Sequence, residues 1–192
     1  MKTKKKILLT GASGTVGLAI LNQLCTIENK YDVTVIDLKS STTIKKLKPF
    51  RKVITMVYGD IRRNVDLIEI SHNQDVIIHL AAIIPPLADQ RAELSYQVNV
   101  KGTENLISLL EINSPNAFFL YSSSISVYGD RLSKPLITVM DDLNPSEGDE
   151  YAKTKILAEE IIQNCKLDWT IFRLTAVMGG HKISKLMFSS TS

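Results

Sequence analysis

The chain has 192 residues, of which 44% are hydrophobic and 22% charged, and its formal net charge is +3. This length and composition are those of one globular domain with a sizeable core, which excludes a disordered or fibrous protein. Much of the charge lies in the opening lysines, Lys2 and Lys4 to Lys6. We interpret them as a solvent-exposed segment that precedes the first strand and not as an arm that binds nucleic acid.

The apolar segments are too short for membrane insertion. The first run, Ile7 to Leu9, cannot form the core of a signal peptide because Gly11 interrupts it, and no later stretch approaches the length of a membrane span. We therefore expect a cytoplasmic protein without a membrane or nucleic-acid partner. Cys25 and Cys165 lie in apolar patterns without metal-ligand spacing, so we expect buried cysteines and no metal site.

Short β-branched runs alternate with segments of helical period, which predicts repeated βαβ units and a parallel sheet. The fold class is therefore α/β, a Rossmann-type doubly wound sheet with helices on both faces in three layers. The predicted strands are Lys6–Thr10, Asp32–Ile36, Val53–Tyr58, Val76–Leu80, Ala117–Ser122 and Thr170–Leu174. The predicted helices are Thr15–Lys30, Asn64–Ser71, Ala88–Glu111 and Glu150–Asn164.

A glycine-rich turn follows the first strand, with the spacing G-x-x-G-x-x-G. Gly11 permits a sharp turn, Gly14 lets backbone amides approach a pyrophosphate, and Gly17 lets the helix lie close to the sheet. A P-loop is excluded because no Gly-Lys-Ser/Thr follows. The segment predicted to bind a dinucleotide consists of Gly11, Ser13, Gly14, Thr15, Val16 and Gly17.

Asp37 stands at the end of the second predicted strand, about 20 residues beyond the glycine turn. A carboxylate in this place accepts hydrogen bonds from the adenosine ribose and repels a 2′-phosphate. The sequence therefore favours NAD over NADP, although Lys39 follows two residues later and weakens that preference.

Tyr151 and Lys155 are four residues apart on a predicted helix, so their side chains share one face. A phenol has a pKa of about 10, and lowering it by roughly three units requires about 4 kcal/mol of preferential stabilisation of the phenolate. We expect the Lys155 ammonium to supply much of this and a bound nicotinamide to supply more. A pair at this spacing is also common on ordinary helix surfaces.

The segment Tyr121 to Gly129 leaves the fifth predicted strand at the same edge of the sheet and contains four serines. A hydroxyl there can hydrogen-bond the substrate oxygen whose proton the tyrosine takes or gives. Serines are also frequent in loops without any role. Ser124 is the serine that we assign to this function.

These segments together resemble the extended short-chain dehydrogenase/reductase superfamily, the NAD-dependent epimerase/dehydratase group. The resemblance rests on an ordered series that spans residues 6 to 180. Its members are Gly11 to Gly17, Asp37, Gly59-Asp60-Ile61, His79-Leu80-Ala81-Ala82, Asn99 to Thr103, Ser122 to Gly129, Tyr151 to Lys155, and Arg173.

The resemblance implies a role for each matching residue. Tyr151 is then the acid/base, Ser124 its hydroxyl partner, and Lys155 also holds the nicotinamide ribose. The cofactor contacts that it implies further along the chain are Asp60 and Ile61 at the adenine, Leu80, Ala81 and Ala82 along the cofactor, and Asn99 near the site. We expect His79 to pack or cap at the strand end.

The serine segment resembles that of 4-epimerases and of hydroxyl or carbonyl reductases more than that of dehydratases. Dehydratases of this group carry an acidic residue two positions before the tyrosine of the segment, where this chain has Ser126. A small-molecule substrate is expected, with a sugar nucleotide as the first candidate. A homodimer formed through the long helices is common in such families and is expected here.

Proteins of this group extend well beyond the sixth strand, and most of their substrate-binding part lies there. In this chain we assign residues 1–180 to the NAD(P)-binding domain and residues 181–192 to a tail that resembles nothing in the group. Three hypotheses stay open: an NAD-dependent epimerase or oxidoreductase, a non-catalytic nucleotide-binding module, and, least favoured, a protein that binds nucleic acid through its basic N-terminus.

Overall fold

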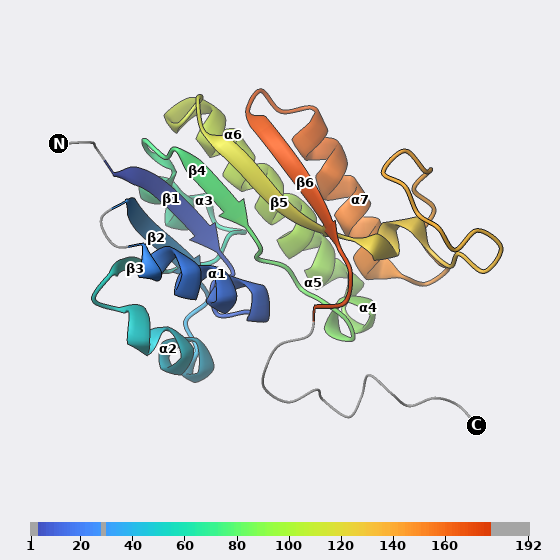
Figure 1. Ribbon diagram of the computed structural model, residues 1–192, viewed down its shortest axis with the longest axis horizontal. Coiled ribbons are helices and arrows are strands. Elements are labelled where there is room, and N and C mark those ends of the chain that lie inside the picture. The colour runs from blue at the N-terminus through green and yellow to red at the C-terminus, as the bar shows by residue number, and fades with distance from the viewer. Residues whose placement is uncertain (1–3, 28–29, 178–192) are drawn as a thin grey trace.

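The computed structural model describes residues 4–27 and 30–177, so the tail 181–192 and its boundary lie outside the described residues. Its sheet has six strands in the order β3-β2-β1-β4-β5-β6, and every pair is parallel (Figure 1). This order confirms the Rossmann-type doubly wound sheet. The strands are β1 Lys5–Thr10, β2 Tyr31–Asp37, β3 Ile54–Tyr58, β4 Val76–His79, β5 Phe118–Ser124 and β6 Asp168–Leu174.

Helices cover both faces of the sheet, as expected for right-handed βαβ crossovers (Figure 1). The α-helices are α1 Thr15–Thr26, α2 Ser41–Leu47, α3 Asn64–Leu67, α4 Leu87–Gln90, α5 Ala92–Tyr96, α6 Gly102–Asn113 and α7 Glu150–Gln163. Short turns of other helical types are η1 Lys48–Phe50, η2 Glu69–Ser71, η3 Gln97–Lys101 and η4 Ile125–Tyr128.

Two apolar clusters separate the layers of the fold. One packs α1 and α2 against one face of the sheet through Leu21, Val35 and Leu47, all at most 3% exposed. The other packs α3, α6 and α7 against the opposite face and includes Leu106 and Ile162, both fully buried. Successive side chains of β1 to β4 therefore enter different cores, which explains why these strands read as continuous apolar runs.

No described helix covers the α1 side of β5 and β6 (Figure 1). Alternation along the strands directs Phe119 and Ile171 into the core beneath α6 and α7, so Phe118 and Phe172 face the other way. These two phenylalanines remain 38% and 52% exposed. Strands β1 to β4 are thus packed on both faces, and within the described residues β5 and β6 are packed on one.

The long helix predicted over Ala88–Glu111 is interrupted, so that prediction is wrong in detail. Arg91 has the non-helical angles φ −136° and ψ 64°, which separate α4 from α5. Between α5 and α6 the backbone forms the π-helical turn η3, a feature that is frequent at functional sites. Asn99 lies in this turn.

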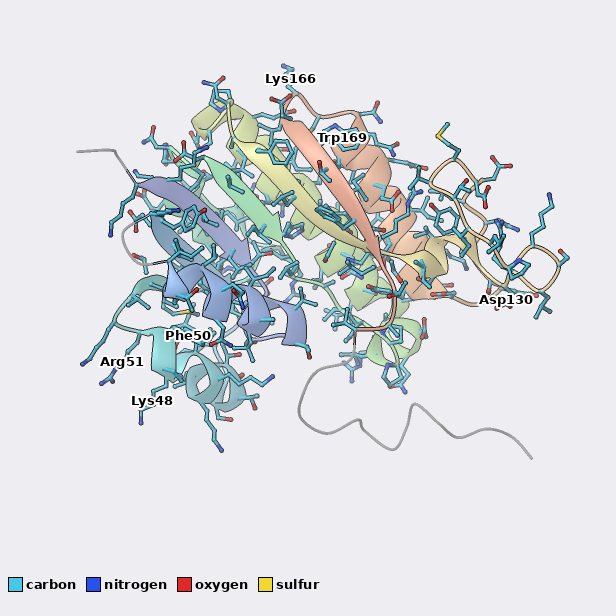
Figure 2. The ribbon with its side chains drawn as sticks, in the orientation of Figure 1. Lys48, Phe50, Arg51, Asp130, Lys166 and Trp169 are labelled. Carbon is cyan, nitrogen blue, oxygen red and sulfur yellow. The ribbon has the colours of Figure 1, made fainter. Side chains whose placement is uncertain are left out.

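The sequence analysis missed α2, which connects β2 to β3. Ser40 caps it by accepting a hydrogen bond from the Thr43 amide at 3.0 Å, and Thr43 and Leu47 are its buried residues. Figure 2 shows Lys48 and Arg51 pointing away from the molecule in the turn that follows.

The cysteines and the hydrophobic segments test two further expectations. Cys25 lies in α1 and Cys165 follows α7, and both are half-buried free thiols, so they are less buried than the apolar pattern indicated. Within residues 4–27 and 30–177, no helix has the length and apolar character needed to cross a bilayer.

A buried ion pair links α7 to the edge strand β6. Arg173 donates to the Glu159 carboxylate through Nε at 3.1 Å and through Nη2 at 2.7 Å, and Glu159 is only 1% exposed. The Arg173 Nη1 group also donates to the Tyr128 hydroxyl. The arginine therefore joins α7, β6 and the turn η4 around one buried carboxylate.

We predict that Arg173→Met lowers the free energy of unfolding by about 3–5 kcal/mol, because it leaves the Glu159 carboxylate buried without its cation. Urea denaturation of the wild type and the variant measures this. The matched control is Lys153→Met, which removes an exposed ion pair with Glu150 on the same helix and should change stability little. Equal losses in both variants would contradict the role assigned to Arg173.

Candidate active site

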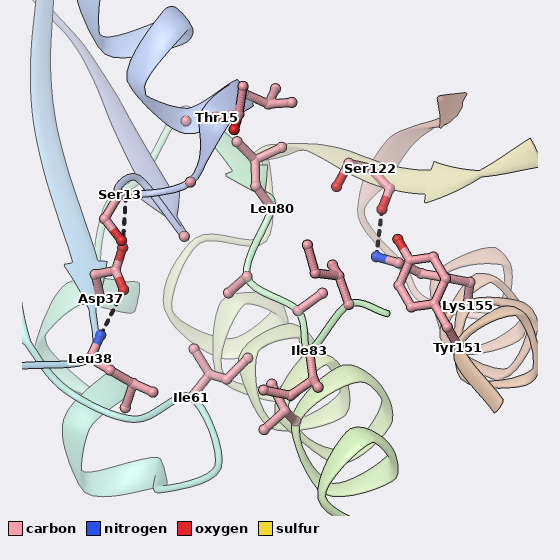
Figure 3. A pocket seen from close by; sticks show the side chains of 18 of the residues that line it. Ser13, Thr15, Asp37, Leu38, Ile61, Leu80, Ile83, Ser122, Tyr151 and Lys155 are labelled. Atoms are coloured by element: carbon pink, nitrogen blue, oxygen red, sulfur yellow. Dashed lines mark hydrogen bonds between the residues drawn. The ribbon is translucent and has the colours of Figure 1, made fainter. Parts of the chain in front are cut away.

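A cleft lies at the carboxyl ends of the strands, where the strand order reverses between β1 and β4 (Figure 3). Its volume is about 650 Å³, within the usual range for small-molecule and cofactor sites. Fifteen of the sixteen residues singled out from the sequence line it. They are Gly11, Ser13, Gly14, Thr15, Val16, Gly17, Asp37, Asp60, Ile61, Leu80, Ala81, Ala82, Ser124, Tyr151 and Lys155.

The glycine turn packs directly against the end of β4. Gly11 has φ +71°, and a Cβ there would lie 2.7 Å from the Ala81 amide nitrogen. A Cβ on Gly17 would lie 2.5 Å from the Gly11 carbonyl oxygen. Only glycine fits at either position.

The N-terminus of α1 points into the cleft region. This helix begins at Thr15 with Gly14 as its N-cap, and no side chain in the described part of the chain caps it. The first amide groups of a helix carry partial positive charge and suit an anion. The residues present at this helix N-terminus therefore fit a pyrophosphate.

Asp37 closes the cleft on the β2 side. Its carboxylate accepts hydrogen bonds from the amides of Ser13 and Leu38, both at 2.8 Å (Figure 3). The Lys46 ammonium, which comes from α2, donates to the Ser13 carbonyl at 2.9 Å. The carboxylate is thus held at the place predicted for the ribose, with a cation nearby that the sequence analysis did not identify.

Asp60 already has a partner in the chain. The Arg62 guanidinium donates to it through Nε at 2.9 Å and through Nη2, and the Arg62 amide donates at 3.0 Å. These hydrogen bonds hold the pKa of the Asp60 carboxyl below its usual value. Contact of Asp60 with an adenine stays a prediction.

Tyr151 and Lys155 lie on α7 at the far wall of the cleft (Figure 3). Asp149 caps this helix by accepting from the Ala152 amide at 2.8 Å, which fixes the first turn that carries Tyr151. The Lys155 ammonium donates to the Ser122 carbonyl at 2.7 Å and is only 1% exposed. The phenol and the glycine turn therefore share one cleft.

Ser124 ends β5 and caps the turn η4. Its Oγ accepts from the Ser126 amide at 3.2 Å and from the Ser126 hydroxyl at 2.9 Å. Because both contacts use the oxygen as acceptor, the Ser124 hydroxyl proton is free to be donated. This suits a group that hydrogen-bonds a substrate oxygen.

A second cavity of about 490 Å³ adjoins the cleft and was not foreseen from the sequence. Pro85, Ser124, Tyr151, Leu174 and Thr175 line both cavities. Arg131 and Ile137, from the long connection between η4 and α7, line only the second. Ser124 and Tyr151 therefore lie at the junction between the cavity that contains the glycine turn and the cavity that does not.

Burial dominates the titration of the tyrosine–lysine pair. It raises the pKa of Tyr151 to about 12, with a further contribution from Asp149. It lowers the pKa of Lys155 to about 7, against the opposing attraction of Glu159. The expectation that the Lys155 ammonium supplies much of the stabilisation of a Tyr151 phenolate is therefore wrong for the chain by itself, because burial of both side chains outweighs it. The contribution expected from a bound nicotinamide stays a prediction.

Asn99 does not line the cleft. Its amide oxygen accepts from the Ile83 amide at 2.7 Å, and its NH₂ group donates to the Ile83 carbonyl and to the Thr154 hydroxyl, both at 2.9 Å. Thr154 donates in turn to the Tyr151 carbonyl at 2.8 Å. Asn99 therefore supports the wall that bears Tyr151 from behind.

A buried polar network fixes the end of β4 and confirms that His79 packs inside the protein. Thr10 Oγ1 accepts from the amides of residues 80 and 81, so its proton goes to His79 Nδ1 at 2.7 Å. His79 Nε2 then donates to Thr103 Oγ1 at 2.9 Å, and the Thr103 hydroxyl donates to the Asn99 carbonyl. The network assigns the neutral Nε2–H tautomer to His79.

The fold and the cleft define a Rossmann-type protein with the serine, tyrosine and lysine arrangement of a short-chain dehydrogenase/reductase. The chain belongs to the 3-beta hydroxysteroid dehydrogenase/isomerase family, whose model matches residues 8–169. The resemblance to the extended superfamily with its epimerases is thereby confirmed.

Two curated relatives illustrate the range of activities among similar proteins. The D-erythronate dehydrogenase of Haemophilus influenzae is 28% identical over 163 residues, which is 83% of this chain and 49% of that protein. The UDP-glucose 4-epimerase of Pisum sativum is 26% identical over 200 residues, which is 96% of this chain and 55% of that protein. The chain thus spans about half the length of the curated relatives it matches.

A solved structure of similar fold is a short-chain dehydrogenase/reductase superfamily protein from Agrobacterium tumefaciens with bound NAD. It is 25% identical, and the superposition has a TM-score of 0.70. The match covers 88% of this chain and 48% of that one.

The depressed pKa of Lys155 predicts how the free energy of unfolding depends on pH. Between about pH 7 and the ordinary lysine pKa of 10.5, the unfolded chain binds a proton that the folded chain lacks, so stability rises with pH. Relative to Lys155→Met, the wild type should gain about 1 kcal/mol per pH unit from pH 7 to 9 and no further difference below pH 6.

Urea denaturation of both proteins across this range measures the difference, and the unpaired Ser122 carbonyl in the variant contributes only a constant offset. Parallel stability curves for the two proteins would show that the Lys155 pKa is not depressed by folding.

Proposed function

We propose that the chain is the dinucleotide-binding part of an NAD-dependent oxidoreductase or epimerase, which transfers a hydride at a hydroxyl-bearing carbon. The observation that carries the proposal is the position of Ser124 and Tyr151 on the wall shared by the two cavities. The cofactor then occupies the larger cavity, with its pyrophosphate at the glycine turn, and the substrate hydroxyl enters from the smaller one.

The cofactor preference follows from Asp37, whose carboxylate suits ribose hydroxyls and repels a 2′-phosphate. The NAD bound in the Agrobacterium protein supports the same choice. When bound, the nicotinamide accepts and returns a hydride and carries positive charge in its oxidised form. The positive charges of Lys46 and Lys39 offset part of the repulsion between the Asp37 carboxylate and a 2′-phosphate. Because they offset only part of it, NADP is the weaker ligand.

Proton transfer falls to Tyr151. Its phenolate takes the proton of the substrate hydroxyl while Ser124 donates a hydrogen bond to the same oxygen, and loss of the hydride from carbon leaves a ketone. The ketone is released by an oxidoreductase, or it is reduced again on its other face by an epimerase. Because burial, together with the Asp149 charge, raises the Tyr151 pKa to about 12, the positive charge of a bound cofactor would be needed to stabilise the phenolate.

The substrate class that we propose is a sugar nucleotide. The absence of an acidic residue at Ser126 argues for epimerisation or oxidation over dehydration. The pea relative named above is a UDP-glucose 4-epimerase. Two other substrate classes compete with the sugar nucleotide: a steroid alcohol, from the family name, and a hydroxy acid, from the name of the Haemophilus relative. A homodimer through the helices stays a prediction.

We predict that Tyr151→Phe leaves NADH binding nearly unchanged and lowers turnover about 10²- to 10⁴-fold, because it removes only the acid/base. NADH fluorescence measures binding. Turnover is measured with UDP-glucose, a 3β-hydroxysteroid and D-erythronate in turn. Tyr58→Phe is the matched control, since Tyr58 is an exposed tyrosine outside both cavities.

The outcomes separate the hypotheses. Tight NADH binding without turnover of any of the three substrates would support a non-catalytic nucleotide-binding module. Turnover that survives in Tyr151→Phe would remove the tyrosine from the mechanism. Failure to bind NADH would overturn the proposal as a whole.

A further inference from the structure

Lys155 is a buried cation without a carboxylate partner among the described residues. Its ammonium is 1% exposed and donates to the Ser122 carbonyl at 2.7 Å. The nearest carboxylate on its own helix, Glu159, is held by three hydrogen bonds from Arg173. Buried charges are ordinarily paired, so another group has to stabilise this one.

The aromatic ring of Tyr121 supplies that group. The Lys155 Nζ atom lies 4.6 Å from the centre of the Tyr121 ring and 5.5 Å from that of Tyr151. Both distances are within the range of cation–π attraction, which is strongest where water is excluded. The ammonium thus lies within cation–π distance of two tyrosine rings.

Tyr121 is held by its ring and not by its hydroxyl. The residue is 2% exposed, and its ring lies 5.7 Å from that of His79 with an interplanar angle of 30°. Its hydroxyl is buried and has no hydrogen-bond partner in the described part of the chain. The ring face toward Lys155 is therefore the part of this side chain that the site uses.

We propose that Tyr121 is a positioning residue of the active site, whose ring holds the Lys155 ammonium at the wall of the cofactor cleft through a cation–π interaction. The proposal deepens the proposed function and rests on it for the role of Lys155. A ring attracts the cation without adding a negative charge. When Lys155 is protonated, its positive charge toward Tyr151 and the cleft is therefore not offset by this group, as it would be by a carboxylate in the same place.

The groups that face Lys155 come from three elements. Tyr151 and Glu159 lie on α7, Tyr121 and the Ser122 carbonyl on β5, and His79 on β4. Glu159 is paired with Arg173. Burial, with a contribution from the Lys155 charge, lowers the pKa of His79 to about 3, so this ring stays neutral at ordinary pH. The pKa of Lys155 is about 7, which means that small changes in its surroundings alter its charge near neutrality.

The test replaces Tyr121 by phenylalanine and then by phenylalanines that carry one, two and three fluorines. Fluorine withdraws charge from the ring face while the shape of the side chain is nearly kept, so the variants should fold. The Lys155 pKa is measured by NMR in the full chain labelled with ¹³C-lysine, and Lys155→Met assigns the resonance. The matched control is the same fluorinated series at Phe119, a fully buried neighbour on β5 that contacts His79.

We expect Tyr121→Phe to keep the Lys155 pKa and the fluorinated series to lower it stepwise, by about half to one pH unit in total. The Phe119 series should leave it unchanged. A Lys155 pKa that is constant along the Tyr121 series, or that falls equally along both series, would overturn the proposal.

The second measurement is the affinity for NADH, made at about pH 7.5 because this pH is near the Lys155 pKa. The affinity should weaken along the Tyr121 series and not along the Phe119 series. A stepwise pKa shift in a protein that binds no NADH would leave the interaction between Tyr121 and Lys155 standing and would refute the proposed function instead.

Discussion

The hydrogen bonds that Thr10 Oγ1 accepts from the amides of Leu80 and Ala81 hold together the two strand ends on which the cleft is built. They hold the segment after β4 against the end of β1, where the backbone of Gly11 lies close to that of Ala81. His79 extends this junction through Thr103 to the π-helical turn. The glycine turn and the wall behind Tyr151 are therefore parts of one buried polar network.

The sheet and the glycine turn could be predicted from the sequence because their causes are local. β-branched runs mark the strands, and the glycine spacing between a strand and a helix marks the turn. The α2 segment was missed because Ser41–Leu47 is short and rich in lysine and threonine, and only two of its residues are buried. The break in the long helix was missed because the contacts of Asn99 with Ile83 and Thr154, which the π-helical turn accommodates, are far apart in sequence.

The residues that line the cleft could be predicted from the sequence, but the pKa shifts of these residues could not. Motif order placed Tyr151, Lys155 and the glycine turn at one edge of the sheet. The direction of the Tyr151 pKa depends on burial, which no spacing reveals. The second cavity depends on a long connection, residues 129 to 149, and on the segment after β6, whose side chains follow no regular period.

The tyrosine–lysine pair is stable in its uncharged form, and a ligand can shift it toward the charged form. Withdrawal from water favours the neutral form of both side chains, so each residue resists the charge that proton transfer requires of it. A ligand that brings positive charge lowers the cost of the phenolate, and a ligand hydroxyl that accepts from Lys155 lowers the cost of the ammonium. Binding and activation are thereby linked in one step.

The uncovered side of β5 and β6 has a consequence for motion. Strands β1 to β4 pack between two apolar layers, whereas in the described part of the chain the edge strand β6 pairs with β5, packs against α7 on one face and leaves Phe172 exposed on the other. With an apolar layer on one face only, β6 has less buried area opposing local opening than β1 and β4, which are packed on both faces. Amide hydrogens of β6 are therefore expected to exchange before those of β1 and β4, the strands that lie beside the glycine turn.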